Sequence, residues 1–143
     1  MSESSTGSSN GPFNLSQLPV HLGATDSQVQ GAVPVTGFVF DPASFEKFVG
    51  EYCPDGSGRL LMVEHSPADW GYWECHPEGD EVVLVLSGSA EFIQEIDGAQ
   101  ERIAVQQGEA VINPAGVWHT ADVSEPLTAL YMTPCANTQH RLR

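Results

Sequence analysis

After Gly58 the chain consists almost entirely of short runs of β-forming residues, and this pattern constrains the fold more than any other feature of the sequence. Residues that favour turns separate the runs, as in Ser66-Pro67, Asp97-Gly98 and the Pro-Ala-Gly turn at 114–116. The runs are 59–65, 71–76, 81–88, 89–96, 102–107, 109–114, 118–123 and 127–133. Eight short strands in succession predict an all-β sandwich or barrel.

A single helix is predicted before these strands, over residues 42–52. Asp41 is suited to cap its start, and Pro42 fits the first helical position. Pro54 ends the pattern, because proline cannot continue a helix. Apolar side chains recur at helical spacing between these points, namely Phe45, Phe48, Val49 and Tyr52.

The length of 143 residues fits one domain, in which three segments are distinguished. Residues 1–12 are rich in serine and glycine and predict a disordered tail, whereas residues 13–57 should add a strand and the helix to a barrel formed by residues 58–143. The strand is expected over 33–40, at the edge of a sheet because of Pro34. An exposed edge with few charges favours pairing with a second copy, so we expect a homodimer.

The charge and the cysteines exclude several classes of protein. With 19 acidic residues against 5 lysines and arginines, the net charge of −14 argues against nucleic acid or an anionic membrane as a partner, since binding phosphates requires clustered cations. No apolar run reaches membrane-spanning length. Three cysteines without a Cys-x-x-Cys pair, and no basic and apolar leader, indicate a cytoplasmic protein in a reducing compartment.

A group of titratable residues at the start of two strands indicates a site. Alternation along 71–76 places Glu74 and His76 on one face, and Glu81 opens the next strand after a four-residue turn, so that it points back toward them. His119 follows the Pro-Ala-Gly turn about forty residues later. Ligating side chains that share a strand face are what a metal site on a sheet requires. His21 and His140 lie in irregular flanking segments and are assigned no role.

These residues resemble the two sequence motifs of the cupin superfamily over roughly residues 58–133. In the first, Gly71 and Gly88 supply the glycines, Glu81 the glutamate and His76 the second histidine, while Glu74 replaces the first histidine. The stretch is similar to small cupins with a W-E-x-H-P-x-G-D-E signature. The second motif is matched at Gly108, Pro114, Gly116 and His119, and its final asparagine is replaced by Val123.

The resemblance implies a cupin-type double-stranded β-helix, or jelly-roll barrel, with Fe, Mn, Ni or Zn inside. It implies that His76, Glu81 and His119 are metal ligands. Glu74 is open to two interpretations, either a fourth ligand or a general base beside the metal.

Two classes of function fit this resemblance. The first is a metal-dependent enzyme acting on a small organic molecule, of the dioxygenase, isomerase or lyase type. The alternative is a non-catalytic module that binds a metal or a small ligand, such as a sensor. The fold does not choose between them, because one fold supports many reactions.

Overall fold

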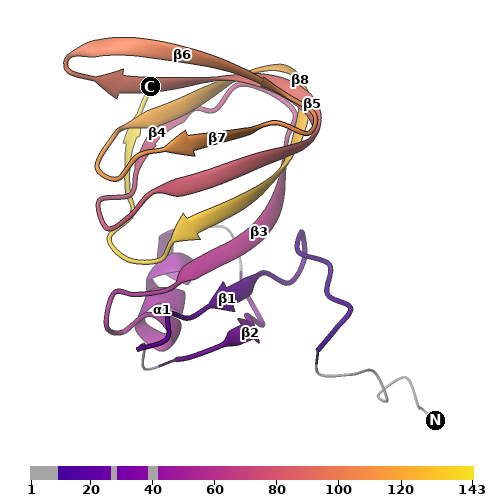
Figure 1. Ribbon diagram of the computed structural model, residues 1–143, viewed down its shortest axis with the longest axis vertical. Helices are drawn as coiled ribbons and strands as arrows, with labels where there is room; N and C mark the ends of the chain where they lie inside the picture. Colours follow the sequence, from indigo (N-terminus) through magenta and orange to yellow (C-terminus); the bar gives the residue numbers. More distant parts are fainter. Residues whose placement is uncertain (1–9, 27–28, 39–41) are drawn as a thin grey trace.

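Two long strands organise the barrel of the computed structural model, which describes residues 10–26, 29–38 and 42–143 (Figure 1). These strands are β5 and β8, each of 16 residues. The elements of the described residues are β1 (Val20–Leu22), β2 (Ala32–Pro34), α1 (Pro42–Tyr52), β3 (Arg59–Ser66), β4 (Tyr72–Cys75), β5 (Glu81–Ile96), β6 (Ala99–Gln106), β7 (Ala110–Asn113), β8 (His119–Pro134) and β9 (Gln139–Leu142). The expected all-β fold with one short helix is confirmed.

The sheet wraps because β5 and β8 each pair with several neighbours along their length. β5 pairs with β6, β7 and β8, and β8 pairs with β3, β4 and β5, always antiparallel. β4 also pairs with β9, which places this last strand beside Glu74. The core within this sheet is continuous with the helix, since Phe48 and Cys53 belong to the same buried cluster as Leu60, Val83 and Phe92.

The break expected between residues 88 and 89 is a bend within a continuous strand. The register of β5 on β8 shifts between Val85 and Ala90, which is the signature of a β-bulge. Gly88 permits the bend because its φ is +82° and a Cβ there would lie 2.0 Å from the carbonyl oxygen of Pro126. Residues 118–123 and 127–133 likewise belong to one strand, so the prediction of separate strands was wrong in both places.

The N-terminal segment differs more from its prediction. The helix has the expected bounds, while its expected cap, Asp41, lies outside the described residues. The expected strand over 33–40 is observed only as β2, residues 32–34, and residues 39–40 lie outside the described part. β1 was not predicted. Of the expected tail, residues 1–9 also lie outside the described residues. No helix among the described residues is both long and apolar enough to cross a membrane.

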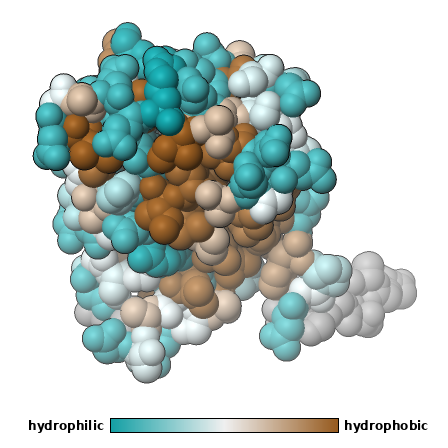
Figure 2. All heavy atoms as spheres, turned by 45° about the horizontal axis from the view of Figure 1, so that its top comes forward, coloured by the Kyte–Doolittle hydropathy of each residue, from teal (hydrophilic) through white to brown (hydrophobic). Residues whose placement is uncertain are grey.

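A homodimer remains a prediction, and apolar side chains on the outside of the barrel support it. β2 does lie at an edge of the sheet, but with three residues it offers only a short pairing surface. Ile112 and Leu86 are 58% and 42% exposed, and Figure 2 shows an apolar region on one face bordered by hydrophilic residues. Burying such a surface favours association. We expect light scattering at micromolar concentration to give the mass of two chains, and the mass of one chain would contradict this.

Candidate metal centre

The register of three neighbouring strands brings three titratable side chains into one row. Glu74 on β4 pairs directly with His119 on β8 and with His140 on β9. Residues that pair directly across strands place their side chains on the same face. β4 ends one residue before His76, and Glu81 begins β5 after the intervening turn, so that both side chains reach the same region. Two motifs separated in sequence therefore meet inside the barrel.

The ligand atoms of Glu74, His76, Glu81 and His119 lie within 4.8 Å of one another. His76 Nε2 is 3.1 Å from Glu74 Oε1 and 3.3 Å from Glu81 Oε2. His119 Nε2 is 3.3 Å from Glu81 Oε1 and 3.6 Å from Glu74 Oε1. The carboxylates and imidazoles thus alternate around one point.

The two imidazoles are fully buried, and their inward nitrogens suit a metal ion. His76 is 1% exposed and His119 0%. Despite the short distances to carboxylate oxygens, neither Nε2 makes a hydrogen bond of acceptable geometry with the described residues. Buried polar nitrogens are rarely left without a partner. Atoms that point at a common centre rather than at one another have the arrangement of ligands, and two imidazoles with two carboxylates match a divalent transition metal.

Hydrogen bonds on the far side of each imidazole fix the ring orientation. His76 Nδ1 lies 3.0 Å from Thr138 Oγ1, and His119 Nδ1 lies 3.4 Å from the carbonyl oxygen of Val117. A carbonyl can only accept, so Nδ1 of His119 carries a proton, and Nε2 is the nitrogen that can present a lone pair to the centre once its own proton is displaced. Partners of this kind orient metal ligands and raise their basicity.

Glu81 is held by a chain of donors that keeps it ionised. Asn113 Nδ2 donates to Oε1 at 3.0 Å and Thr133 Oγ1 donates to Oε2 at 2.7 Å. Asn113 is itself fixed by Gln94, whose Nε2 donates to its Oδ1 at 3.0 Å. Burial alone would raise the pKa of Glu81, but its close contacts with the imidazoles of His119 and His76 outweigh burial and lower the pKa to about 2.

Without a metal, the two imidazoles hold protons. Burial lowers the pKa of each ring, but the close contacts with the carboxylates of Glu74 and Glu81, and their negative charge, outweigh burial. The pKa of His76 rises to about 10 and that of His119 to about 9. The metal-free cluster is therefore two imidazolium–carboxylate pairs with no net charge. A metal ion must displace these protons to bind.

This predicts how the metal-free protein responds to pH. A group whose folded pKa is raised stabilises the fold fully below its unfolded value of 6.5 and loses that contribution as pH rises through its folded pKa. We therefore expect the melting temperature of the chelator-treated protein to fall by at least about 5 °C between pH 6.5 and 10. Calorimetry should show a much smaller fall after loading with Zn²⁺. Equal falls in both forms would contradict this assignment.

Glu74 differs from Glu81 because its second oxygen leaves the cluster. Oε1 faces the two buried imidazoles, whereas Oε2 accepts a hydrogen bond from His140 Nε2 at 2.8 Å. Burial would raise the pKa of Glu74, but close contacts with the imidazoles of His119, His140 and His76 lower it well below its usual value. The side chain of His140 is 43% exposed. Glu74 thus connects the cluster with a histidine that reaches the surface.

A cavity of about 390 Å³ opens onto Glu74, His76 and Glu81. Most of its wall is apolar or aromatic, namely Phe45, Met62, Trp70, Tyr72, Tyr131 and Leu142. Glu64 also lines it, and burial followed by repulsion from Glu74 and Glu81 raises the pKa of Glu64 to about 7. A carboxyl group that is half protonated near neutral pH adds little charge to the cavity.

The four candidate ligands come together as the sequence predicts, and two further contributors were missed. His140 was assigned no role because β9 was not predicted, and Thr138 lies in the turn before it. The segment 139–142 is short, exposed and mostly polar, so no apolar alternation marks it as a strand. Only the pairing of Glu74 with His140 reveals the contact.

Residues 61–133, just over half of the chain, match the family described as Cupin domain. No curated protein matches the chain in sequence.

Among solved structures, a cupin-2 domain containing protein from Shewanella frigidimarina is 24% identical with a TM-score of 0.46, over 53% of this chain and 70% of its own. A protein with a double-stranded β-helix domain from Klebsiella pneumoniae is 24% identical with a TM-score of 0.48, over 59% and 73%. Hydroquinone 1,2-dioxygenase from Sphingomonas sp. TTNP3 is 17% identical with a TM-score of 0.43, over 52% of this chain and 58% of its own. This chain therefore spans less than two thirds of that dioxygenase.

Proposed function

The chain belongs to the cupin family, and on that premise we propose that its barrel holds one divalent transition-metal ion and acts as an enzyme on a small, uncharged organic molecule. The observation that carries the proposal is the convergence of four buried ligand atoms beside a largely apolar cavity. Two of these atoms are imidazole nitrogens without a hydrogen-bond partner among the described residues.

In this proposal His76, Glu81 and His119 bind the ion, and Glu74 contributes Oε1 as the fourth ligand. Two carboxylates balance the charge of a divalent ion, so the loaded centre has no net charge. Fe, Mn, Ni and Zn all accept such a mixed nitrogen and oxygen set. When bound, the ion would act as a Lewis acid that polarises an oxygen of the substrate.

The lining of the cavity favours an uncharged substrate. A metal-loaded centre without net charge and a partly protonated Glu64 offer no positive charge to an anion. Arg141 is the one arginine or lysine of the described lining, and its Nη2 is already paired with Glu95 Oε2 at 2.5 Å. Its guanidinium also lies over aromatic rings, so it is not available to bind a substrate carboxylate. Aromatic and apolar walls instead select a small molecule with an apolar body.

Glu74 and His140 form the pair suited to move a proton during the reaction. The carboxylate accepts from His140 Nε2 on one side and faces the ligand cluster on the other. A substrate that gives up an O–H or C–H proton in the cavity can pass it to the imidazole of His140, which lines the cavity and is oriented by Glu74, and this exposed ring can exchange the proton with water. This step is needed both for oxygenation of an enol or phenol and for isomerisation of a carbonyl compound.

The proposal is tested by metal content and turnover together. The protein is purified without added metal, analysed for its elements, and assayed for O₂ uptake and product formation with catechols and β-diketones. We expect bound transition metal whose amount falls in the His119→Gln variant, and turnover that stops with a chelator and returns with the metal. Metal and ligand binding without turnover of any compound would instead indicate a non-catalytic binding module.

A further inference from the structure

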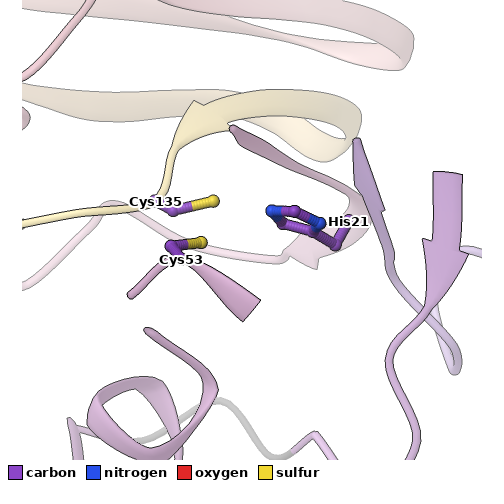
Figure 3. A group of neighbouring side chains, drawn as sticks. All are labelled: His21, Cys53 and Cys135. Carbon is purple, nitrogen blue, oxygen red and sulfur yellow. The ribbon is translucent and has the colours of Figure 1, made fainter. Parts of the chain in front are cut away.

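A second group of potential ligands lies outside the barrel cavity, and Figure 3 shows it. His21 on β1, Cys53 directly after α1 and Cys135 directly after β8 have ligand atoms within 4.8 Å of one another. Their exposed fractions are 0%, 1% and 0%. None of the three belongs to the centre formed by Glu74, His76, Glu81 and His119. In Figure 3 a ring nitrogen of His21 faces both sulfur atoms.

His21 supplies an independent indication that this group binds something. Neither of its ring nitrogens has a hydrogen-bond partner among the described residues, although the side chain is wholly buried. Its ring packs against Phe48 and Tyr52, with ring centroids 6.0 and 5.7 Å away. Such surroundings favour the neutral imidazole, which has one donor and one lone pair to satisfy. A buried polar group without partners costs stability unless a ligand satisfies it.

The backbone around His21 makes room for the imidazole at this place. A Cβ on Gly58 would lie only 2.5 Å from His21 Nε2, and Gly58 has a φ of +94°. Any other residue would therefore displace the ring as well as strain the backbone. The amide of Cys135 donates to the carbonyl oxygen of Gly58 at 3.4 Å, which ties the same glycine to the segment that carries the thiol. Gly58 thus holds the imidazole close to Cys135.

We propose that His21, Cys53 and Cys135 bind a soft metal ion, Zn²⁺, at a structural site separate from the barrel centre. Two thiolates balance the charge of Zn²⁺ and the neutral imidazole adds a third ligand, which leaves no net charge in a buried place. A water molecule would complete the tetrahedral set of four that Zn²⁺ prefers. Thiolate ligands select this ion over Mg²⁺ or Ca²⁺, which require oxygen ligands. The thiols would lose their protons on binding.

The site would join parts of the chain that are far apart in sequence. β1 and the end of α1 come from the N-terminal segment, whereas Cys135 follows the last residue of β8. Cys135 also opens the turn that carries Thr138, the partner of His76, and leads into β9 with His140. A bound ion would therefore fix the N-terminal segment to the barrel and anchor the turn behind the barrel centre.

Titration of the reduced protein with Co²⁺ tests the site, because thiolate ligation gives a charge-transfer absorption in the near ultraviolet. We expect this absorption in the wild type and its loss in Cys53→Ser/Cys135→Ser. The matched control is Cys75→Ser, since Cys75 is also buried, 4% exposed, but lies on β4 away from this group. The control should keep the absorption. The barrel variant His119→Gln should also keep it, because none of the four barrel ligands is a thiolate.

Thermal unfolding supplies a second readout. An excess of Zn²⁺ should raise the melting temperature of the His119→Gln protein by about 5 °C or more. The rise should be much smaller in a protein that also lacks both thiols. If the double serine variant does not fold, Cys53→Ala alone serves the same purpose.

Absence of the charge-transfer absorption in the reduced wild type, or its persistence without the two thiols, would overturn the proposal. So would a Cys53–Cys135 disulfide in the protein purified under reducing conditions, shown by thiol counting. If the barrel centre binds no metal but the absorption is present, the proposal for His21, Cys53 and Cys135 is supported and the proposed function is not. If the absorption is absent but the barrel centre binds metal, the proposed function is supported and the thiolate site is not.

Discussion

Replacing His119 with glutamine should lower the affinity of the barrel centre for Zn²⁺ or Mn²⁺ by about 100-fold or more. Changing a residue that merely orients a ligand already lowers metal affinity by about 10- to 100-fold, so removing a ligand should cost at least as much. Glutamine fills most of the space of the imidazole and avoids a large cavity around a side chain that is 0% exposed. Competition with a chromogenic chelator, in the Cys53→Ser/Cys135→Ser background, measures the affinity of this centre alone.

His65 provides the matched control for this variant. It lies on β3 and is exposed. Its Nδ1 contacts Thr128 Oγ1 at 2.8 Å, and Thr128 is not one of the four cluster residues. His65→Gln should leave the metal affinity within about twofold of the parent protein, since exposed substitutions away from a site have small effects. Equal affinities of the His119→Gln and His65→Gln proteins would show that His119 is not a ligand.

The second large effect concerns Glu74, whose two oxygens have different neighbours. If Oε1 is a ligand as we propose, Glu74→Gln should lower metal affinity by about 10-fold or more and lower the melting temperature of the metal-loaded protein. His140→Gln removes the partner of Oε2 but leaves Oε1 in place. That variant should lower metal affinity less than Glu74→Gln does, because the ligand atom itself is kept, and it should lose most of its turnover. Titration and steady-state assays on both variants separate the two roles.

The result expected for a general base is different. In that case Glu74→Gln would keep full metal content and lose activity, so that both variants would behave alike, and Glu74 would not be a ligand. Restoring the histidine that the first cupin motif has at this position, Glu74→His, should tighten the binding of Zn²⁺ or Ni²⁺ in either case, because imidazole suits these ions better than carboxylate.

Local sequence patterns are enough to predict the strands and the grouping of Glu74, His76 and Glu81, whereas His119 joins this group through the resemblance to the second cupin motif. Alternation along residues 71–76 places Glu74 and His76 on one face, and turn residues mark the return at Glu81. The observed cluster agrees with both expectations. These features depend on neighbours in the chain, so they can be read from it directly.

The remaining features depend on contacts between distant segments, which a single sequence does not display. His140 joins the site through the register of β9 on β4, and the thiols of Cys53 and Cys135 meet only after the helix and the end of β8 are placed. At Gly88 the sequence predicts a turn between two strands, because glycine favours turns as well as bends within a strand. Here the long partner β8 keeps the strand continuous.

A crystal structure of the metal-loaded protein, with anomalous diffraction data recorded at the absorption edge of the bound metal, tests the central claim most directly. The account predicts one anomalous peak bonded to His76 Nε2, His119 Nε2, Glu81 and Glu74 Oε1, with His140 still hydrogen-bonded to Glu74 Oε2. A loaded crystal without a peak between these residues would contradict the claim that this cluster is a metal centre. A peak bonded to the two histidines and Glu81, with the carboxylate of Glu74 turned away, would contradict the role proposed for Glu74.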